Sequence, residues 1–275
     1  MDLDLLDRTL RERGEPPFRA RQVWEWTARG ASGYGAMTNL PRALREELAS
    51  VVRFSTLEVE TERESRDGTV KTLFRTADGH PVEAVLMRYR DGRRSLCLSS
   101  QSGCPLTCTF CATGAMAFGR NLTASEILDQ ALHFRRATEV DHAVFMGMGE
   151  PMLNLDEVLG AARRLPDLGI THRRTTISTV GWLPGLRRFV DEVDEAASVG
   201  GRAAARPNTP PTTAGGLYEG SSRDRIAAFR HELERARVPV TVRLTRGRDI
   251  EAACGQLAAA PRIGRSARSR AGAAT

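Results

Sequence analysis

Several features that mark whole classes of protein are missing from this 275-residue sequence. No apolar run approaches the roughly 20 residues that a membrane-spanning helix needs, so we expect no membrane association. The first residues, Met1 to Asp4, carry neither a basic segment nor an apolar core, so no secretory signal peptide is predicted. The five cysteines are an odd number, which argues against a secreted disulfide scaffold. Together these absences predict a cytoplasmic protein.

The basic charge of the chain comes almost wholly from arginine, and the formal net charge at pH 7 is +6. Guanidinium groups match the geometry of phosphate, so a polyanionic partner is one interpretation. A general preference for Arg codons is the alternative, and composition alone does not separate the two. The length is sufficient for one large domain or two small ones with a substantial core.

Three cysteines, Cys104, Cys108 and Cys111, stand at a C-x3-C-x2-C spacing. Structural zinc usually has four protein ligands, so three thiols without a nearby His leave one position unfilled. Iron–sulfur clusters also bind Cys thiolates, and a cluster held by three of them keeps one iron open to a small molecule. Buried packing with a chance spacing, or a disulfide, is the alternative. Clustered thiols in an intracellular chain are more often metal ligands, so the trio favours a cluster.

The first hundred residues predict helices and then short strands. Apolar spacing indicates three helices within residues 1–50, the last beginning near Pro41 and running to about Leu48, with Thr38 or Asn39 as its cap. Short alternating runs then follow, separated by the Asp-Gly pairs at 67–68, 78–79 and 91–92. Such pairs are typical of hairpin turns, so these runs predict a meander of antiparallel strands.

The next part of the chain alternates between strands and helices, which predicts a parallel sheet. Thr123 followed by Glu126 indicates a capped helix start. The cysteine trio, Gly149-Glu150 and Ser178 each follow an expected strand. Ligands bind at the carboxyl ends of parallel strands, so we expect these residues to converge. Strands are expected at 96–98, 144–146 and 175–179, and helices at 127–138, 155–165 and 183–190.

The segment from 96 to 114 resembles the cluster motif of radical S-adenosylmethionine (SAM) enzymes, and within them the RlmN family of RNA adenine-C2 methyltransferases. This resemblance implies that Cys104, Cys108 and Cys111 hold a 4Fe-4S cluster whose free iron chelates the amino and carboxylate groups of SAM. It also implies that Gly149 and Glu150, in the family's G-E motif, bind SAM. Ser178, in an S-T-x-G run, matches a further position that contacts the cofactor.

Three more residues match family motifs, although a lone Cys is usually a small buried hydrophobe and a strand Glu is usually exposed. Cys254 stands in R-G-x-D-I-x-A-A-C-G-Q-L, and the family residue takes a methyl group from one SAM while a second SAM is cleaved at the cluster. Cys97, in L-C-x-S-S-Q-x-G-C, is implied to form a disulfide with Cys254 as the methylated base leaves. Glu83, in V-E-x-V-L, is implied to be the proton acceptor.

The N-terminal residues include an F-R-A-x-Q-V-x-x-W run that is similar to the family's accessory domain, which assists RNA binding. Arg19, Arg21, Arg42 and Arg45 are the candidate RNA contacts. A packed helical module without contact to RNA is the alternative.

Residues 196–216 depart from the family pattern, because they have no period and a Pro/Gly/Thr/Ala bias typical of a linker. The family has about three further strand–helix units at this place, including two runs that contact SAM. The resemblance therefore implies an α/β fold in which a radical SAM (β/α) barrel is incomplete. The expected domains are a helical accessory domain (1–52), a β meander (53–94), a partial barrel (95–195), a linker (196–216), the C-terminal part of the core (217–260) and a tail (261–275).

The implied activity is methylation of carbon 2 of an adenosine in 23S ribosomal RNA and in certain tRNAs. It uses the cluster, two SAM molecules per turnover and a reducing donor such as flavodoxin. Two alternatives stay open at this point. One is the related Cfr type, which methylates carbon 8 of the same adenosine, and the other is a degenerate relative that does not turn over.

Overall fold

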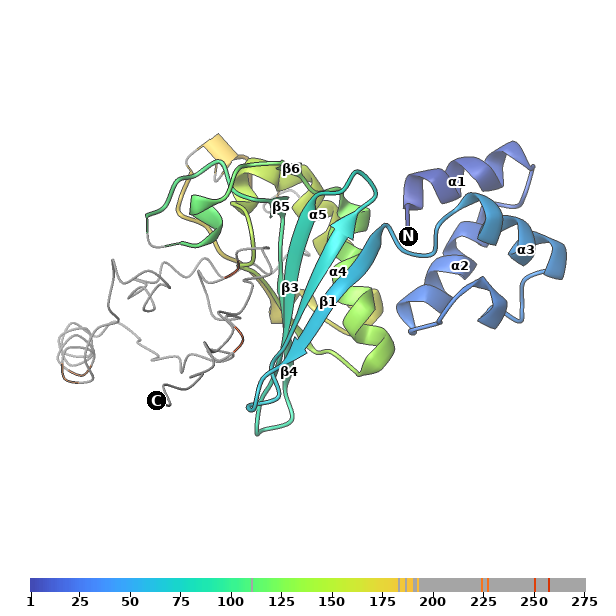
Figure 1. Ribbon diagram of the computed structural model, residues 1–275. Helices are drawn as coiled ribbons and strands as arrows, with labels where there is room; N and C mark the ends of the chain where they lie inside the picture. Colours follow the sequence, from blue (N-terminus) through green and yellow to red (C-terminus); the bar gives the residue numbers. More distant parts are fainter. Residues whose placement is uncertain are drawn as a thin grey trace, which may run out of the picture.

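The computed structural model describes residues 1–109 and 111–182, together with residues 184–185, 187–189, 192, 224, 227, 250 and 257. Three helices at the N-terminus lie to one side of a six-stranded sheet, and two further helices pack on the sheet itself (Figure 1). The predicted linker at 196–216 and most of the predicted C-terminal part lie outside the described residues. In the described part, no helix is both long and apolar enough to span a membrane.

The N-terminal helices follow the predicted apolar spacing. They are α1 (Leu3–Glu12), α2 (Phe18–Ala28) and α3 (Arg42–Val51), with a 3-10 turn η1 (Tyr34–Ala36) before α3. Their buried faces share one apolar cluster that includes Leu6, Met37, Leu48 and Val52. α3 continues one turn past Leu48, and this brings Val52 into that cluster.

The predicted cap of α3 is wrong. Pro41 is the N-cap residue, and no side chain caps the helix. The Asn39 side chain is used elsewhere, because its Oδ1 accepts a hydrogen bond of 2.6 Å from Trp26 Nε1. A proline at the helix boundary has its φ fixed near the helical value, so α3 begins without a side-chain cap.

The predicted meander is confirmed as four antiparallel strands. They are β1 (Leu57–Glu64), β2 (Val70–Thr76), β3 (Pro81–Arg88) and β4 (Arg94–Leu98). Each Asp-Gly pair makes a turn whose glycine has positive φ, at +77° for Gly68, +85° for Gly79 and +85° for Gly92. Only glycine adopts this conformation readily, which explains why these positions end the strands.

From β4 onward the sheet becomes parallel, as predicted. The chain runs through α4 (Ala124–Ala137), β7 (His142–Phe145), α5 (Leu155–Arg164) and β8 (Thr175–Ile177). The strand order is β1-β2-β3-β4-β7-β8, with β4, β7 and β8 parallel. The described residues form no closed barrel, so the expectation of an α/β fold with an incomplete barrel is confirmed.

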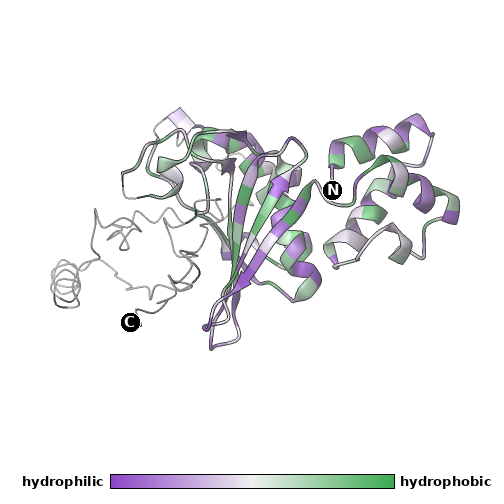
Figure 2. Ribbon diagram, viewed as in Figure 1, coloured by the Kyte–Doolittle hydropathy of each residue, from purple (hydrophilic) through white to green (hydrophobic). Residues whose placement is uncertain are grey.

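The two faces of the sheet differ in what covers them. α4 and α5 cover one face (Figure 1), where Phe74, Leu96 and Phe145 are buried with Ile127 of α4. The other face, called the inner face below, carries an apolar cluster of Leu73, Val85, Cys97, Val144, Met148 and Leu257. Figure 2 shows hydrophobic residues along the strands and hydrophilic residues toward the hairpin tips.

Candidate active site

Three predicted motifs meet at one edge of the sheet. The cysteine loop follows β4, Gly149-Glu150 follows β7 and Ser178 follows β8, and these three strands are parallel. The main-chain N–H of Ser178 donates to Phe145 O at 3.2 Å, which holds the end of β8 against the end of β7. The predicted convergence of these residues is therefore present in the structure.

The loop that carries the cysteines is closed by a small two-stranded ladder. β5 (Gln101–Ser102) pairs with β6 (Arg120–Asn121), so the intervening residues form one compact loop. Gly114 packs so closely that a Cβ there would lie 2.7 Å from the carbonyl oxygen of Cys108. Such a contact is too short for any side chain, so the fold requires glycine beside this cysteine.

The three thiols of this loop are free, and each is partly exposed. Burial raises the pKa of Cys104 and of Cys108, and the neighbouring Cys111 thiol raises both further. The Glu150 carboxylate also raises the pKa of these two thiols. A metal binds the thiolate form, so metal loading here would release protons.

The donor set fits an iron–sulfur cluster better than a single ion. Among the described residues, no three His, Cys, Asp or Glu side chains form a group that could hold one metal ion. The thiolates of a cluster bind different irons, so they surround a group larger than one ion. Three free thiols on one loop, with no fourth ligand among the residues that the structure describes, match that requirement.

Glu150 is buried, with 3% of its surface exposed, and it ties two loops together. Its Oε1 accepts from the main-chain N–H of Met152 at 3.0 Å and from Thr179 Oγ1 at 2.5 Å. Its Oε2 accepts from the N–H of Val180 at 3.0 Å. A carboxylate has about four acceptor positions, so the geometry leaves capacity for a ligand ammonium group.

The Gly147–Glu150 loop lies directly against the chain that leads to the cysteines. The carbonyl oxygen of Met148 accepts from the N–H groups of Ser100 and Gln101 at 2.9 and 3.2 Å. A Cβ at Gly147 would lie 2.5 Å from Ser99 Oγ, and one at Gly149 would lie 2.6 Å from Gln101 Cβ. Both glycines are therefore needed for this close approach between the two segments.

Cys97 and Glu83 lie on the inner face, near the same edge. Cys97 pairs with Val85 across the β3–β4 ladder, and Glu83 is two residues from Val85, so its side chain points to the same face. The expectation of an exposed strand Glu is wrong, because Glu83 is only 3% exposed. β3 lies between two neighbouring strands, and both of its faces are covered. The Glu83 carboxylate is paired with Lys71, whose Nζ lies 3.1 Å from Oε1.

Cys254 lies outside the described residues, but Leu257 lies within them. Leu257 is buried in the inner-face cluster with Cys97 and Val144. Its carbonyl oxygen accepts from Thr113 Oγ1 at 2.6 Å, which joins it to the cysteine loop. The chain therefore returns to the neighbourhood of Cys97 three residues after Cys254.

Lys71 lies beside Glu83, and no sequence motif points to it. It is the only lysine in the sequence, among 40 basic residues, and its partner is the expected proton acceptor. The sequence contains one signal for this position, since Lys71 is a single lysine in an arginine-rich chain.

The four arginines predicted to contact RNA all have partners within the chain. The Arg19, Arg21 and Arg42 side chains pair with a Glu one helical turn away, at 3.3, 2.9 and 2.7 Å, and Arg45 Nη1 donates to Gly35 O at 2.9 Å. The pairs of Arg21 and Arg42 are exposed and contribute little free energy, so phosphate groups can compete for these two arginines. The Arg19 and Glu15 side chains are only 19% and 21% exposed. The contact of the four arginines with RNA remains a prediction.

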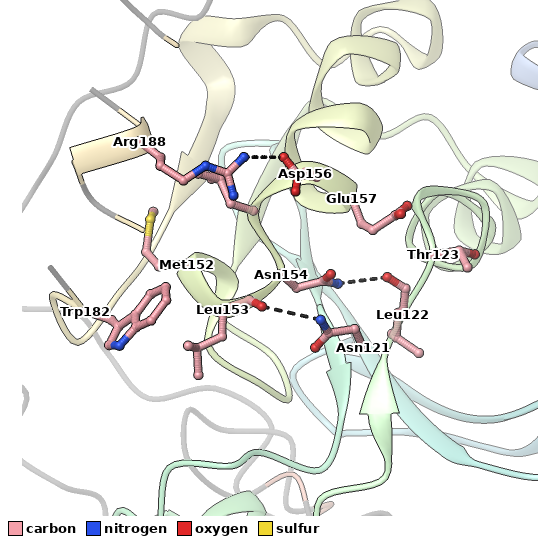
Figure 3. Close-up of a pocket in the computed structure, with 11 residues that line it drawn as sticks. Asn121, Leu122, Thr123, Met152, Leu153, Asn154, Asp156, Glu157, Trp182 and Arg188 are labelled. Carbon is pink, nitrogen blue, oxygen red and sulfur yellow. Dashed lines mark hydrogen bonds and ion pairs between the residues drawn. The ribbon is translucent and has the colours of Figure 1, made fainter. Parts of the chain in front are cut away.

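A cavity of about 380 Å³ is lined by residues other than the predicted site residues. Figure 3 shows Trp182 and Met152 on one side of it and Asn121 and Leu122 on the other. Its polar groups are largely paired, as in the 2.5 Å contact between Arg188 Nη2 and Asp156 Oδ1. None of the predicted site residues lines it, so we do not assign the chemistry to this cavity.

Comparison with known proteins agrees with this geometry. Residues 1–53 match the family model of the ribosomal RNA large subunit methyltransferase N-terminal domain, and residues 98–205 match that of the radical SAM superfamily. A probable dual-specificity RNA methyltransferase RlmN of Thermus thermophilus is 35% identical, with 93% of this chain and 92% of that protein covered. The chain belongs to the RlmN family.

Further relatives support the assignment to the RlmN family. The dual-specificity RNA methyltransferase RlmN of Nitratidesulfovibrio vulgaris is 36% identical, and 90% of this chain and 89% of that protein are covered. The crystal structure of a radical SAM methyltransferase from Sphaerobacter thermophilus matches with a TM-score of 0.78 and 32% identity, over 94% of this chain and 98% of that one. The family predicted from the motifs is thus confirmed.

The alignments also bear on the irregular segment. The alignments to the Thermus and Nitratidesulfovibrio proteins extend over 336 and 327 residues, more than the 275 residues of this chain. Those relatives therefore carry positions that have no counterpart here. This agrees with the expectation that strand–helix units of the family are missing from this RlmN-type chain.

Proposed function

We propose that this chain is a radical SAM methyltransferase that forms 2-methyladenosine in 23S ribosomal RNA and in certain tRNAs. The observation that supports it most is the position of Cys97 and Glu83 on the inner face, beside the loops that carry the cysteine trio and Gly149-Glu150. RNA methyltransferases of the RlmN type are the relatives found, and the basic charge of the chain suits an RNA substrate.

The target explains why such a site is needed. Carbon 2 of adenine is electron-poor and carries no acidic proton, so it offers no nucleophile to a sulfonium methyl group. A carbon-centred radical can add to this carbon instead. The cluster with bound SAM supplies the electron that generates such a radical.

We assign the binding roles to residues at the strand ends. Cys104, Cys108 and Cys111 hold the 4Fe-4S cluster, and Gly149, Glu150 and Ser178 bind SAM. Two SAM molecules are consumed per turnover, because one donates its methyl group to Cys254 and the other is cleaved. A reducing protein such as flavodoxin supplies electrons.

Cys254, Cys97 and Glu83 carry the covalent steps. A hydrogen atom leaves the methyl group on Cys254, and the resulting carbon radical bonds to carbon 2 of adenine. The adduct would return one electron to the oxidised cluster, and Glu83 accepts the proton that carbon 2 loses. The Cys97 thiolate then attacks the sulfur of Cys254, so that an S–S bond forms and the S–C bond breaks. The released electron pair stays on the departing carbon, which takes up a proton and becomes the methyl group.

The shortened length of the chain gives a second candidate, a relative that binds the cluster or RNA without turnover. We place the missing positions at residues 196–216, between the partial barrel (95–195) and the C-terminal part (217–260). Two runs that contact SAM in the family fall in the missing units. A loss of turnover is therefore a candidate for this chain in particular. The accessory domain at 1–52 and the meander at 53–94 would be intact in either case.

The deciding experiment is anaerobic reconstitution of the full chain, followed by reaction with SAM, a reductant and a 23S rRNA fragment. We expect mass spectrometry to detect 2-methyladenosine in the RNA and a methyl group on Cys254. The Cys97→Ala variant should stop at a covalent protein–RNA adduct, and Cys104→Ala should lose the cluster. 8-Methyladenosine would support the Cfr type, and a cluster without any methylated base would support the inactive relative.

A further inference from the structure

Lys71 lies next to the expected proton acceptor on the inner face of the sheet. Its Nζ is 3.1 Å from Glu83 Oε1, and the two side chains are 12% and 4% exposed. Lys71 is the only lysine among the 40 lysine and arginine residues of the sequence. An ammonium is a compact charge on a flexible stem, whereas a guanidinium is a planar fork that grips a carboxylate at two points. A lysine and an arginine at position 71 would therefore hold the Glu83 carboxylate in different geometries.

The main chain of Glu83 is held independently of this pair. Ser99 Oγ donates to the carbonyl oxygen of Glu83 at 2.5 Å, and the N–H of Glu83 donates to Met148 Sδ at 3.3 Å. The N–H of Met148 in turn donates to Ser99 Oγ at 2.7 Å. These bonds fix the Cα of Glu83 against the loop that precedes Glu150, so the remaining freedom of Glu83 lies in its side-chain torsions.

The contact with Lys71 matters because the Glu83 carboxylate is buried. A carboxylate removed from water needs a compensating charge or hydrogen bonds to stay ionised. The ammonium supplies such a charge at a known oxygen, and it also restricts the side-chain torsions that the main-chain bonds leave open. The same contact thus places a compensating charge beside the Glu83 carboxylate and restricts its direction.

We propose that Lys71 is a positioning residue that holds the Glu83 carboxylate aimed at carbon 2 of the bound adenine. This rests on the proposed function, in which Glu83 accepts a proton. In that step the proton moves from carbon 2 to a Glu83 carboxylate oxygen and the electron pair of the C–H bond stays in the ring. Lys71 takes no part in the proton transfer and does not touch the substrate.

The test compares Lys71→Met, Lys71→Arg, Glu83→Gln and the double variant Lys71→Met/Glu83→Gln in the full reconstituted chain. Arg75→Met is the matched control, since it removes a cation from the same strand and breaks its ion pair with Glu60. For each protein, cluster content, 5′-deoxyadenosine, 2-methyladenosine and the covalent adduct are measured. A 23S rRNA fragment with deuterium on carbon 2 of adenosine is run beside the ordinary fragment.

Lys71→Met should keep cluster content and 5′-deoxyadenosine within about twofold of the wild type and lose roughly 100-fold in 2-methyladenosine, as expected for an impaired proton transfer. It should show a deuterium isotope effect larger than that of the wild type. Lys71→Arg should lose less. The double variant should be no slower than Glu83→Gln alone, because both changes act on one step. Arg75→Met should resemble the wild type.

Three outcomes would overturn the role of Lys71. These are a wild-type methylation rate in Lys71→Met, an equal loss of 5′-deoxyadenosine and methylated base, and additive losses in the double variant. If Lys71→Met does not fold, Lys71→Arg decides, because it keeps the charge but displaces the carboxylate; a wild-type rate without an increased isotope effect would refute the proposal. Failure of the wild type to methylate RNA would instead refute the proposed function.

Discussion

Trp24 Nε1 donates a hydrogen bond of 2.7 Å to Asp167 Oδ2, which joins the N-terminal helices to the sheet domain. Trp24 lies on α2 and Asp167 on the 3-10 turn η4 (Leu165–Leu168) that follows α5. The Trp24 ring is also part of the main core, and the Arg164 guanidinium lies over it at 5.2 Å. One residue thus supplies an apolar, a polar and a cationic contact between the two parts.

Trp24→Phe should lower the free energy of unfolding by about 1–2 kcal/mol, because a hydrogen bond to a charged acceptor is lost while most apolar contacts remain. Urea unfolding followed by circular dichroism measures the change. Trp26→Phe is the control, since Trp26 Nε1 bonds to Asn39 within the N-terminal part. An unchanged urea midpoint in Trp24→Phe would show that this junction contributes no net stability.

A second prediction concerns the start of α4. Thr123 Oγ1 accepts from the N–H of Glu126 at 3.2 Å, and the Glu126 side chain accepts from the N–H of Thr123 at 3.0 Å, which completes a capping box. Thr123→Ala should cost about 1 kcal/mol of stability. Thr138→Ala, at the other end of α4, should cost less, because only the main chain of Thr138 caps that end. Equal melting temperatures for the two variants would contradict this.

Local rules of sequence account for much of this fold. The capping box at Thr123 and the Asp-Gly turns follow from side-chain and backbone preferences within four residues, so they were predictable. The alternation of strands and helices fixed the parallel order of β4, β7 and β8, and with it the edge where the motifs meet. The positions of Glu150 and Ser178 at that edge required no knowledge of distant contacts.

Two expectations, the cap of α3 and the exposure of Glu83, are wrong because a residue distant in the sequence determines where each side chain bonds. Asn39 was a reasonable cap for α3, but its side chain bonds to Trp26, and a local pattern does not reveal such competition. The strand pattern predicts an exposed Glu83, because alternating apolar and polar residues describe a sheet with one face in solvent. Here both faces of β3 are covered, and Lys71 on the neighbouring strand compensates the buried charge.

A third prediction concerns pH. Hydrogen bonds from Arg120 and then from Thr76 hold the pKa of Asp78 well below its ordinary value. A carboxylate whose pKa is lowered by folding stabilises the fold at pH values above its pKa in the unfolded chain, which is 3.8. This stabilisation is lost as the pH falls from 3.8 toward the lower pKa of the folded protein. Asp78→Asn should therefore destabilise the protein at pH 7, and the difference from the wild type should shrink below about pH 4.

The size of this effect is limited by solvent. The Asp78 side chain is 50% exposed, so screening keeps the expected loss at pH 7 below about 1 kcal/mol, and added salt should reduce it. Unfolding curves of both proteins at pH 7 and pH 3, each at low and high salt, test the prediction. A difference that is constant across these pH values would assign the effect to packing and not to charge.

The last prediction tests whether cluster binding depends on the closure of the cysteine loop. It compares Gly103 with a second glycine that has similar backbone strain but lies outside the loop. Gly103 has a φ of +71°, and a Cβ there would lie 2.3 Å from Ala117 O. Gly79 has a φ of +85°, but a Cβ there meets nothing within 4 Å. An alanine at either position adopts an unfavourable backbone conformation, at a cost of about 1–2 kcal/mol. Only at Gly103 does the methyl group also push the two ends of the loop apart.

Gly103→Ala should therefore lose iron and sulfide after anaerobic reconstitution, because the displaced loop no longer brings its thiols together. Gly79→Ala should reconstitute like the wild type despite a similar backbone cost. Iron and sulfide content, the visible absorption spectrum and a melting curve are measured on both. A wild-type cluster spectrum in Gly103→Ala would show that cluster binding does not depend on this closure, whereas equal losses in both variants would assign the defect to stability alone.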